Sequence, residues 1–276
     1  MNALHYNALQ YSLALLFYGA GAGIIIHHHF HGVERPSRLS WVLVMLGWGS
    51  QGWWMGNYLG AQGGMLAVGL AASLQMSGMA LGMIYLVGWW LRPREVRASG
   101  LLLVPLMILF LLASAGVPGA EREARHALDP VFFVHLVLSL LAYGLISVAA
   151  VVALLDGVQE WALRTKHFNP IFQVMPALGA LETALFATVR WGWVLLTLSI
   201  VTGAWVSHDA LGVWLTFSHK VLLSLLTWGL FAVLLVGHWR WGWRGRRVVR
   251  WTVTGYLFLV LGFLGVKFVT EILLGR

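Results

Sequence analysis

Eight apolar stretches, each about long enough to cross a lipid bilayer, constrain this chain more than any other feature. A membrane-spanning helix needs roughly 20 mostly apolar residues to cross a hydrocarbon core of about 30 Å. Of the 276 residues, 59% are hydrophobic and 10% are charged, whereas soluble domains carry roughly a quarter charged residues. No strand-like alternation is present, so helices must satisfy the backbone within lipid. The predicted spans are residues 6–26, 39–59, 66–91, 98–117, 130–155, 189–207, 213–236 and 249–274.

The sequence therefore predicts an all-α polytopic protein of about eight membrane helices. Thirteen Lys and Arg residues fall in the odd-numbered connections, against three in the even-numbered connections and the tail. Positive residues favour the cytoplasmic side, so both termini are expected on the periplasmic, outer side of a bacterial plasma (inner) membrane. This topology, with contact to anionic membrane lipid, explains the net charge of +8 without any nucleic-acid partner.

The chain is predicted to be a single integral membrane domain over 1–276, with a four-helix half at 1–128 and a second half at 129–276. Two glycine pairs four residues apart, Gly19 with Gly23 and Gly78 with Gly82, are expected to let neighbouring helices approach closely. The one sizeable polar stretch, 156–188, is broken by prolines, and its segment "ALGALETALF" is expected to form a separate amphipathic helix at the membrane surface.

Histidines within the spans are the candidate functional residues, since ionisable side chains in a membrane are costly and usually functional. Asp129 and Pro130 predict a helix start, with the acid as N-cap and the proline in the first turn. His135 then lies about 8 Å below the outer edge. The next-but-one helix is expected to begin near Val213, which puts His219 about 9 Å down.

Two histidines at one depth on different helices favour axial ligation of a single haem iron, with His135 as the outer ligand and His219 as its partner. Ser139 and Ala142, on the same helical face as His135, are expected to leave room for the macrocycle. Each histidine could instead be a structural polar contact between helices.

His238 belongs to a second position, about 28 Å further along its helix than His219 and rotated by roughly 100°. It precedes "WRWGWRGRR", where Arg244, Arg246 and Arg247 are suited to bind haem propionates as bidentate donors. His238 is therefore a candidate inner ligand, although a histidine at a helix end is also common as an interfacial residue.

Other ionisable groups have simpler interpretations. Lys220 is expected to extend to the outer surface, and Lys267 to pair with Glu271 one turn later. The run His27, His28, His29 and His31 is expected to be an interfacial cap, with Zn or Cu binding as the alternative.

The chain has no cysteine, which excludes disulfides, thiolate metal sites and thioether-linked haem on its own residues. It has no nucleophile elbow, phosphate loop or carboxylate pair. We therefore expect no enzymatic activity.

Three segments resemble the cytochrome c assembly family of haem-handling membrane proteins. They are "HLVLSLLAYGLISVAAVVALL" (135–155), "LETALFATVRWGWVLLTLSIVTGAW" (181–205) and the run "HKVLLSLLTWGLFAVLLVGHWRWGWRGRRVVRW" with the helix after it (219–269). The resemblance covers about 130–274 and is closest to the smaller eight-span branch called YpjD-like or HemX-like, rather than to the larger CcsA or CcmC proteins.

The resemblance implies roles for two histidines. His135 stands where the family has its first externally facing histidine, and His238 stands at the membrane histidine linked to haem entry from the cytosolic half. The chain departs from the family pattern in "WVSHDALGVWLTFSH" (205–219), which keeps only Trp205 and Trp214 of a tryptophan-rich platform. It also lacks a second external histidine after the last helix, and His219 is our candidate replacement.

The expected function is to bind or move haem in support of cytochrome c biogenesis, with a b-type haem held non-covalently and transiently. Expected partners are haem, membrane lipid and other proteins of cytochrome c biogenesis or membrane transport. One alternative is a non-haem accessory subunit, or a transporter of a metal ion or other small solute, whose histidines are structural. Another is an electron-carrying membrane cytochrome with permanently bound haem.

Overall fold

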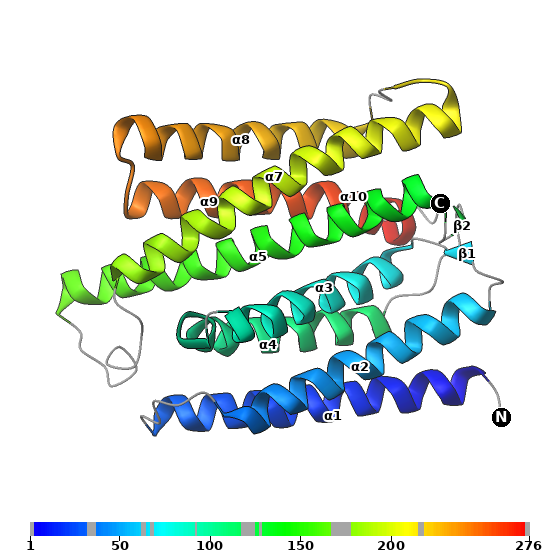
Figure 1. Cartoon of the computed structure of the whole chain (residues 1–276), viewed down its shortest axis with the longest axis horizontal. Coiled ribbons are helices and arrows are strands. Elements are labelled where there is room, and N and C mark those ends of the chain that lie inside the picture. Colours follow the sequence, from blue (N-terminus) through cyan, green and yellow to red (C-terminus); the bar gives the residue numbers. More distant parts are fainter. Residues whose placement is uncertain are drawn as a thin grey trace. The chain divides into compact units, whose positions relative to one another are not determined.

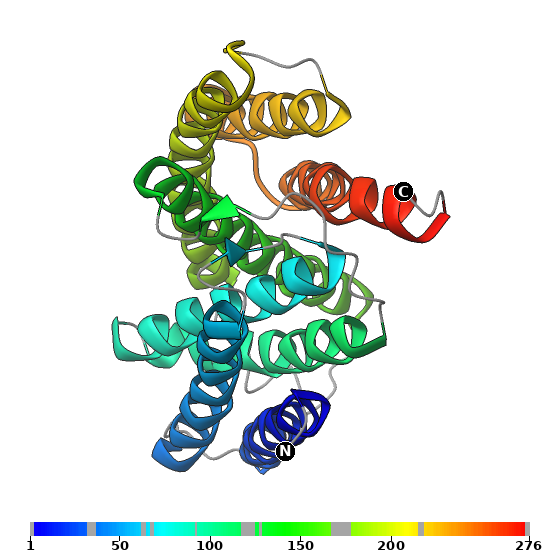
Figure 2. The same cartoon turned by 90° about the vertical axis from the view of Figure 1, so that its right-hand side faces the viewer.

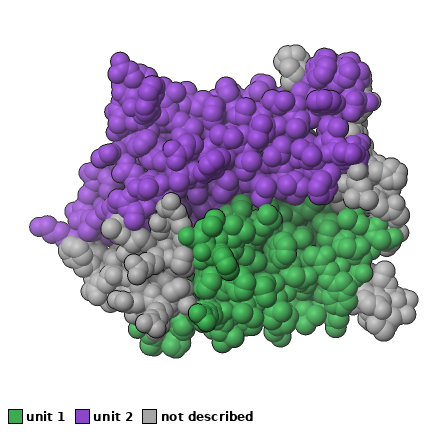
Figure 3. Space-filling view, in the orientation of Figure 1, with its two compact units in different colours: residues 1–127, 169–176 green, residues 128–168, 177–276 purple. Residues whose placement is uncertain are grey.

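The computed structural model describes residues 3–31, 37–61, 65–66, 69–91, 93–116, 125–126, 129–166, 178–214 and 218–273. The chain divides into two compact units, coloured separately in Figure 3. Unit 1 contains the described elements up to residue 126, and unit 2 contains those from residue 129 onward.

Unit 1 is a group of four helices with one short strand pair. The helices are α1 (Ala3–Phe30), α2 (Arg38–Ala61), α3 (Leu70–Leu91) and α4 (Pro93–Gly116). Helix α1 packs on α2 and α4, and α3 packs on α4 and α2. The two-residue strands β1 (Met65–Leu66) and β2 (Arg125–His126) pair antiparallel, a detail that the apolar pattern did not predict.

Unit 2 consists of two antiparallel helix pairs. Helices α5 (Pro130–Thr165) and α7 (Leu178–Leu211) lie along each other, as do α8 (His219–Trp241) and α9 (Arg246–Val260), as Figures 1 and 2 show. The last helix continues from α9 through η1 (Leu261–Gly265), α10 (Val266–Phe268) and η2 (Val269–Leu273).

These directions define two ends of unit 2. The start of α5, the end of α7 and the start of α8 form what we call the His135 end (Figure 1). The end of α5, the start of α7, the end of α8 and the start of α9 form the His238 end. The unit therefore separates the two candidate sites as the helix spacing predicted.

The helical architecture is confirmed, since a long helix is present at every predicted span. Six described helices are long and apolar enough to cross a membrane: α1, α3, α5, α7, α8 and the last helix from Arg246 to Phe268. Helix α2 is not among them, and the apolar part of α4, Gly100–Gly116, is shorter. Eight spans and outer termini therefore stay predictions.

Two predicted helix boundaries are wrong. The segment "ALGALETALF" forms no separate helix, because from Leu178 it is the first part of a single helix that reaches Leu211. Helix α8 begins at His219 and not near Val213, because the Ser218 hydroxyl caps it by accepting from the Val221 N–H at 3.4 Å.

The glycine pairs behave differently from each other. A Cβ at Gly82 would lie 2.7 Å from the Trp48 ring, and one at Gly78 would contact Gln51, so close approach at this pair is confirmed. A Cβ at Gly19 or Gly23 would meet no described atom within 4 Å, so the prediction for that pair is wrong.

Unit 1 buries an unusually polar set of side chains between its helices. The Tyr18 hydroxyl of α1 donates to Gln51 Oε1 of α2 at 2.6 Å, and both side chains are at most 1% exposed. The Ser114 hydroxyl of α4 donates to Gln75 Oε1 of α3 at 3.1 Å. In a lipid environment such interhelical hydrogen bonds stabilise helix association.

Tyr18→Phe is expected to lower the unfolding free energy by about 1 kcal/mol, because it leaves the buried Gln51 carbonyl without a donor. Tyr18→Phe with Gln51→Leu should cost less than the sum of the single substitutions. The measurement is a double-mutant cycle of denaturant unfolding in mild detergent. Additive single effects would show that the hydrogen bond contributes nothing.

Candidate functional sites

His135 lies five residues into α5 at a helix start that matches the prediction. Asp129 is the N-cap, its carboxylate accepts from the Val131 and Phe132 N–H groups, and Pro130 follows in the first turn. The imidazole is half-buried and reaches across to α7.

The His135 ring is held there by hydrogen bonds to α7. Its Nδ1 lies 3.0 Å from the backbone oxygen of Ser199 and 3.3 Å from Thr202 Oγ1. A carbonyl oxygen only accepts, so Nδ1 carries the proton and Nε2 keeps its lone pair. No described residue hydrogen-bonds Nε2. Metal-ligating histidines commonly show this second-shell arrangement.

The face of α5 below His135 is packed, which corrects the prediction of open space for a macrocycle. The Ser139 hydroxyl donates to the His135 carbonyl at 2.6 Å and lies 2.7 Å from Ser199 Oγ, while Ala142 is 1% exposed. A Cβ at Gly203 would lie 2.9 Å from His135 Cε1, so glycine is required where the ring meets α7. Small residues here allow helix contact.

His219 lies at the His135 end of unit 2. It is the first residue of α8 and is exposed, because that helix begins later than predicted. Among the described residues, no hydrogen bond or ring contact joins His219 to His135. The two histidines lie at one end of the unit, and their shared ligation of one iron stays a prediction.

His208 is a further residue at this end that the sequence analysis missed. Its ring stacks on Trp214 with centroids 4.2 Å apart, and Trp205 and Trp214 are both more than half exposed. The signal was available in "WVSHDALGVW", where His208 lies between the two tryptophans. The His135 end thus presents exposed aromatic rings and imidazoles together.

His238 is held at the opposite end in the same way as His135. Its Nδ1 lies 3.1 Å from the backbone oxygen of Trp243, and its ring stacks on Phe186 of α7 with centroids 3.5 Å apart. The proton again lies on Nδ1 and leaves the Nε2 lone pair available. The Trp243 ring covers Gly237, where any Cβ would overlap the indole.

The arginines after His238 have different surroundings. Arg244 Nε lies 3.3 Å from Glu182 Oε1, and the Arg247 guanidinium lies 5.2 Å from the centroid of the Trp243 ring. All three predicted propionate-binding arginines line one open cavity of about 600 Å³ at the His238 end. The cavity lining is Glu160, Arg164, Trp241, Gly242, Trp243, Arg244, Gly245, Arg246 and Arg247.

The remaining ionisable candidates have these positions. Lys220 is exposed, and Lys267 is buried with its Nζ 5.5 Å from the centroid of the Phe263 ring. Its predicted pairing with Glu271 lies outside the described side chains.

The histidine run shows no metal site in the described part of the chain. The centroids of the His27 and His31 rings are 4.1 Å apart where α1 ends, and His31 Nδ1 lies 2.9 Å from the His27 carbonyl. No group of three described His, Asp or Glu side chains could hold a metal ion. The side chain of His29 lies outside the described residues.

Comparison with known proteins identifies the family. Residues 67–274 match the family model described as cytochrome C assembly protein. The chain is 29% identical over 270 residues to a 28.8 kDa protein of Azospirillum brasilense, covering 97% of this chain and 98% of that one. It is 35% identical over 182 residues to the inner membrane protein YpjD of Escherichia coli, covering 64% and 67% of the two chains. It is 24% identical over 260 residues to the protein HemX of Brevibacillus brevis, covering 92% and 94%.

The family match spans parts of both units and most of the described helices. It confirms the resemblance that the second half of the sequence carried, including the YpjD-like and HemX-like branch. Together with six helices able to cross a membrane, these relatives establish the cellular location. The chain is a multi-pass inner-membrane protein of the cytochrome c assembly family.

Proposed function

We propose that this chain binds b-type haem non-covalently and transiently at two separate positions, with His135 as the ligand at one end of unit 2 and His238 as the ligand at the other. Membership of the cytochrome c assembly family supports a role in cytochrome c biogenesis. One observation carries the finer proposal: both imidazoles donate Nδ1–H to a backbone carbonyl and direct an available Nε2 lone pair away from it. Imidazole nitrogens held in this way are suitable axial ligands for haem iron.

The two histidines have different surroundings, and each end of unit 2 would be a separate haem position. At the His238 end, Arg246 and Arg247 line the cavity and could bind propionates, while Arg244 would have to exchange its contact with Glu182. At the His135 end, Trp205, Trp214 and His208 offer exposed rings, and His219 is available as a second ligand. The chain would supply ligands and orientation, and the redox chemistry would belong to the iron.

We further propose that the chain has eight membrane spans with both termini in the periplasm, which puts the His135 end outside and the His238 end in the cytosol. The basic connections of the sequence support this orientation. We infer that the chain handles haem without forming thioether bonds itself, so it acts with other proteins of cytochrome c biogenesis and not as an enzyme.

The competing proposal is a non-haem accessory subunit or transporter with structural histidines. The same hydrogen bonds favour it in one respect, because a histidine that only joins two helices would also donate to a carbonyl. The two proposals differ in whether the Nε2 atoms of His135 and His238 bind haem iron.

The test is rescue of a ligand-deleted variant by free imidazole. In purified protein titrated with ferric haem, His135→Gly and His238→Gly are each expected to weaken binding at the position of the deleted ligand by more than about 100-fold, because even second-shell changes cost about 10- to 100-fold. Added imidazole should restore the Soret band, since it can occupy the vacated space and supply the missing nitrogen.

His28→Gly, in unit 1, is the matched control and should leave the titration unchanged. If both glycine variants bind haem as wild type does, the histidines are structural and the competing proposal gains support. A loss of haem binding that imidazole does not rescue would also contradict axial ligation.

A further inference from the structure

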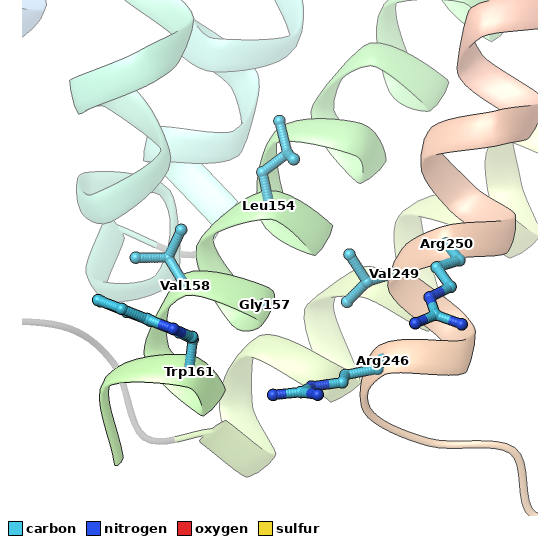
Figure 4. A pocket seen from close by; sticks show the side chains of 7 residues that line it. All are labelled: Leu154, Gly157, Val158, Trp161, Arg246, Val249 and Arg250. Carbon is cyan, nitrogen blue, oxygen red and sulfur yellow. The ribbon is translucent and has the colours of Figure 1, made fainter. Parts of the chain in front are cut away.

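A second feature at the His238 end is an apolar groove on the outside of unit 2, between α5 and α9. The groove has a volume of about 320 Å³. Its lining is Leu154, Gly157, Val158 and Trp161 from α5, with Arg246, Val249 and Arg250 from α9, as shown in Figure 4. It is distinct from the arginine-rich cavity at the same end of the unit, with which it shares only Arg246.

The floor of the groove is built by close contact of the two helices. A Cβ at Gly157 would lie 3.3 Å from Val249 Cγ1, so the helices meet there and the aliphatic side chains flank the contact. Leu154 and Val158 are each 49% exposed. Both helices are long and apolar enough to cross the membrane, so this floor is suited to an acyl chain.

The rim of the groove is positively charged. Arg246 and Arg250 are one turn apart on α9, with their Cα atoms about 6 Å apart along the helix axis, and Figure 4 shows the Arg246 side chain extending from α9 toward α5. Neither arginine makes an ion pair with a described residue, and no carboxylate lines the groove. The nearby Glu160 carboxylate is bound by Arg164 at 2.6 Å.

Two further features place this rim at the level of lipid headgroups. Trp161 is 52% exposed beside Arg246, and exposed tryptophans gather where the membrane meets water. Helix α9 starts at Arg246 without a side-chain cap on its first N–H groups, so its positive dipole end adds to the attraction for an anion.

We propose that this groove binds an anionic phospholipid. One acyl chain lies along Leu154, Gly157 and Val158, and Arg246 and Arg250 bind the headgroup phosphate as a pair of forked donors. The charge of the rim selects the anionic headgroup and the apolar floor selects a lipid over a soluble phosphate. This inference does not depend on haem binding.

The experiment compares lipid binding to the full purified chain by native mass spectrometry, with phosphatidylglycerol and phosphatidylcholine as probes. Each juxtamembrane arginine favours anionic lipid by roughly fivefold, so we expect phosphatidylglycerol to bind about 25-fold more tightly to the wild type. Arg246→Gln with Arg250→Gln should bring the ratio close to one, whereas the double lysine variant should retain most of it.

Arg190→Gln with Arg240→Gln is the charge-matched control, because both residues are exposed on unit 2 and neither lines the groove. It should keep the preference. Val158→Trp should weaken binding of both lipids by filling the groove while the arginines stay intact.

Three results would overturn the proposal. The first is an unchanged lipid ratio in the Arg246 and Arg250 double glutamine variant. The second is an equal loss in the control, which would show that net charge alone attracts the lipid. The third is displacement of phosphatidylglycerol by millimolar inorganic phosphate or glycerol phosphate, which would identify a site for a soluble anion.

Discussion

Gly203→Ala is expected to weaken haem binding at His135 by about 10- to 100-fold without unfolding the protein. The added Cβ would lie 2.9 Å from His135 Cε1 and 3.3 Å from its Nδ1, closer than atoms in van der Waals contact. The imidazole is the group that can move, and moving it breaks the 3.0 Å hydrogen bond to Ser199. Nε2 would then lose its fixed direction although the histidine is still present.

The control is Gly229→Ala on α8, where the new Cβ would have no described neighbour within 4 Å. Alanine favours a helix over glycine by about 1 kcal/mol, so neither variant should be destabilised through its helix. The measurement is haem titration beside thermal unfolding of each variant. Wild-type haem affinity in Gly203→Ala would contradict a ligand role for His135 in this orientation.

Trp243→Ala is expected to lower the unfolding free energy by about 2 kcal/mol and to abolish haem binding at His238. The half-buried indole covers Gly237, lies under Arg247 at 5.2 Å, and packs beside Trp251 with centroids 5.6 Å apart. Removing a buried tryptophan costs about 3–5 kcal/mol, and partial exposure reduces that value. The backbone carbonyl that orients His238 belongs to residue 243. Without the indole, this carbonyl would lose its fixed position.

Trp239→Ala is the matched control, because Trp239 is 85% exposed on the same end of α8. It should leave both the stability and the haem titration close to wild type. The measurement is denaturant unfolding in detergent followed by the titration in native conditions. An equal loss in the two tryptophan variants would mean that the contact of the Trp243 ring with Gly237 does not hold the His238 site.

The helical architecture could be predicted from the sequence, because apolar stretches of about 20 residues must form helices to satisfy their backbone hydrogen bonds in lipid. The start of α5 was also predictable, since the Asp129–Pro130 pair combines a capping acid with a residue that suits the first turn. The start of α8 was not, because "VWLTF" before Ser218 is as apolar as the helix that follows. Composition does not distinguish an apolar connection from an apolar helix, although the Ser218 cap was a usable signal.

The candidate residues could be chosen from the sequence, but the contacts that hold them could not. The identity of His135 and His238 followed from their places near helix ends. Their carbonyl partners did not, because Ser199 is 64 residues from His135 in the chain and contributes only a backbone oxygen. The contacts of Ser139 and Gly203 could not be predicted for a similar reason. A small residue indicates that another group approaches closely, but the sequence does not tell whether that group is a helix or a ligand.

The most direct test of the account is the haem content of the full chain purified in mild detergent from a haem-replete host. The wild type should show a Soret band and a pyridine haemochrome spectrum typical of non-covalent b-type haem. His135→Ala combined with His238→Ala should show neither, while its helix content stays that of wild type. The same Soret band in the double variant, or none in the wild type after haem is added, would contradict haem binding by these two histidines.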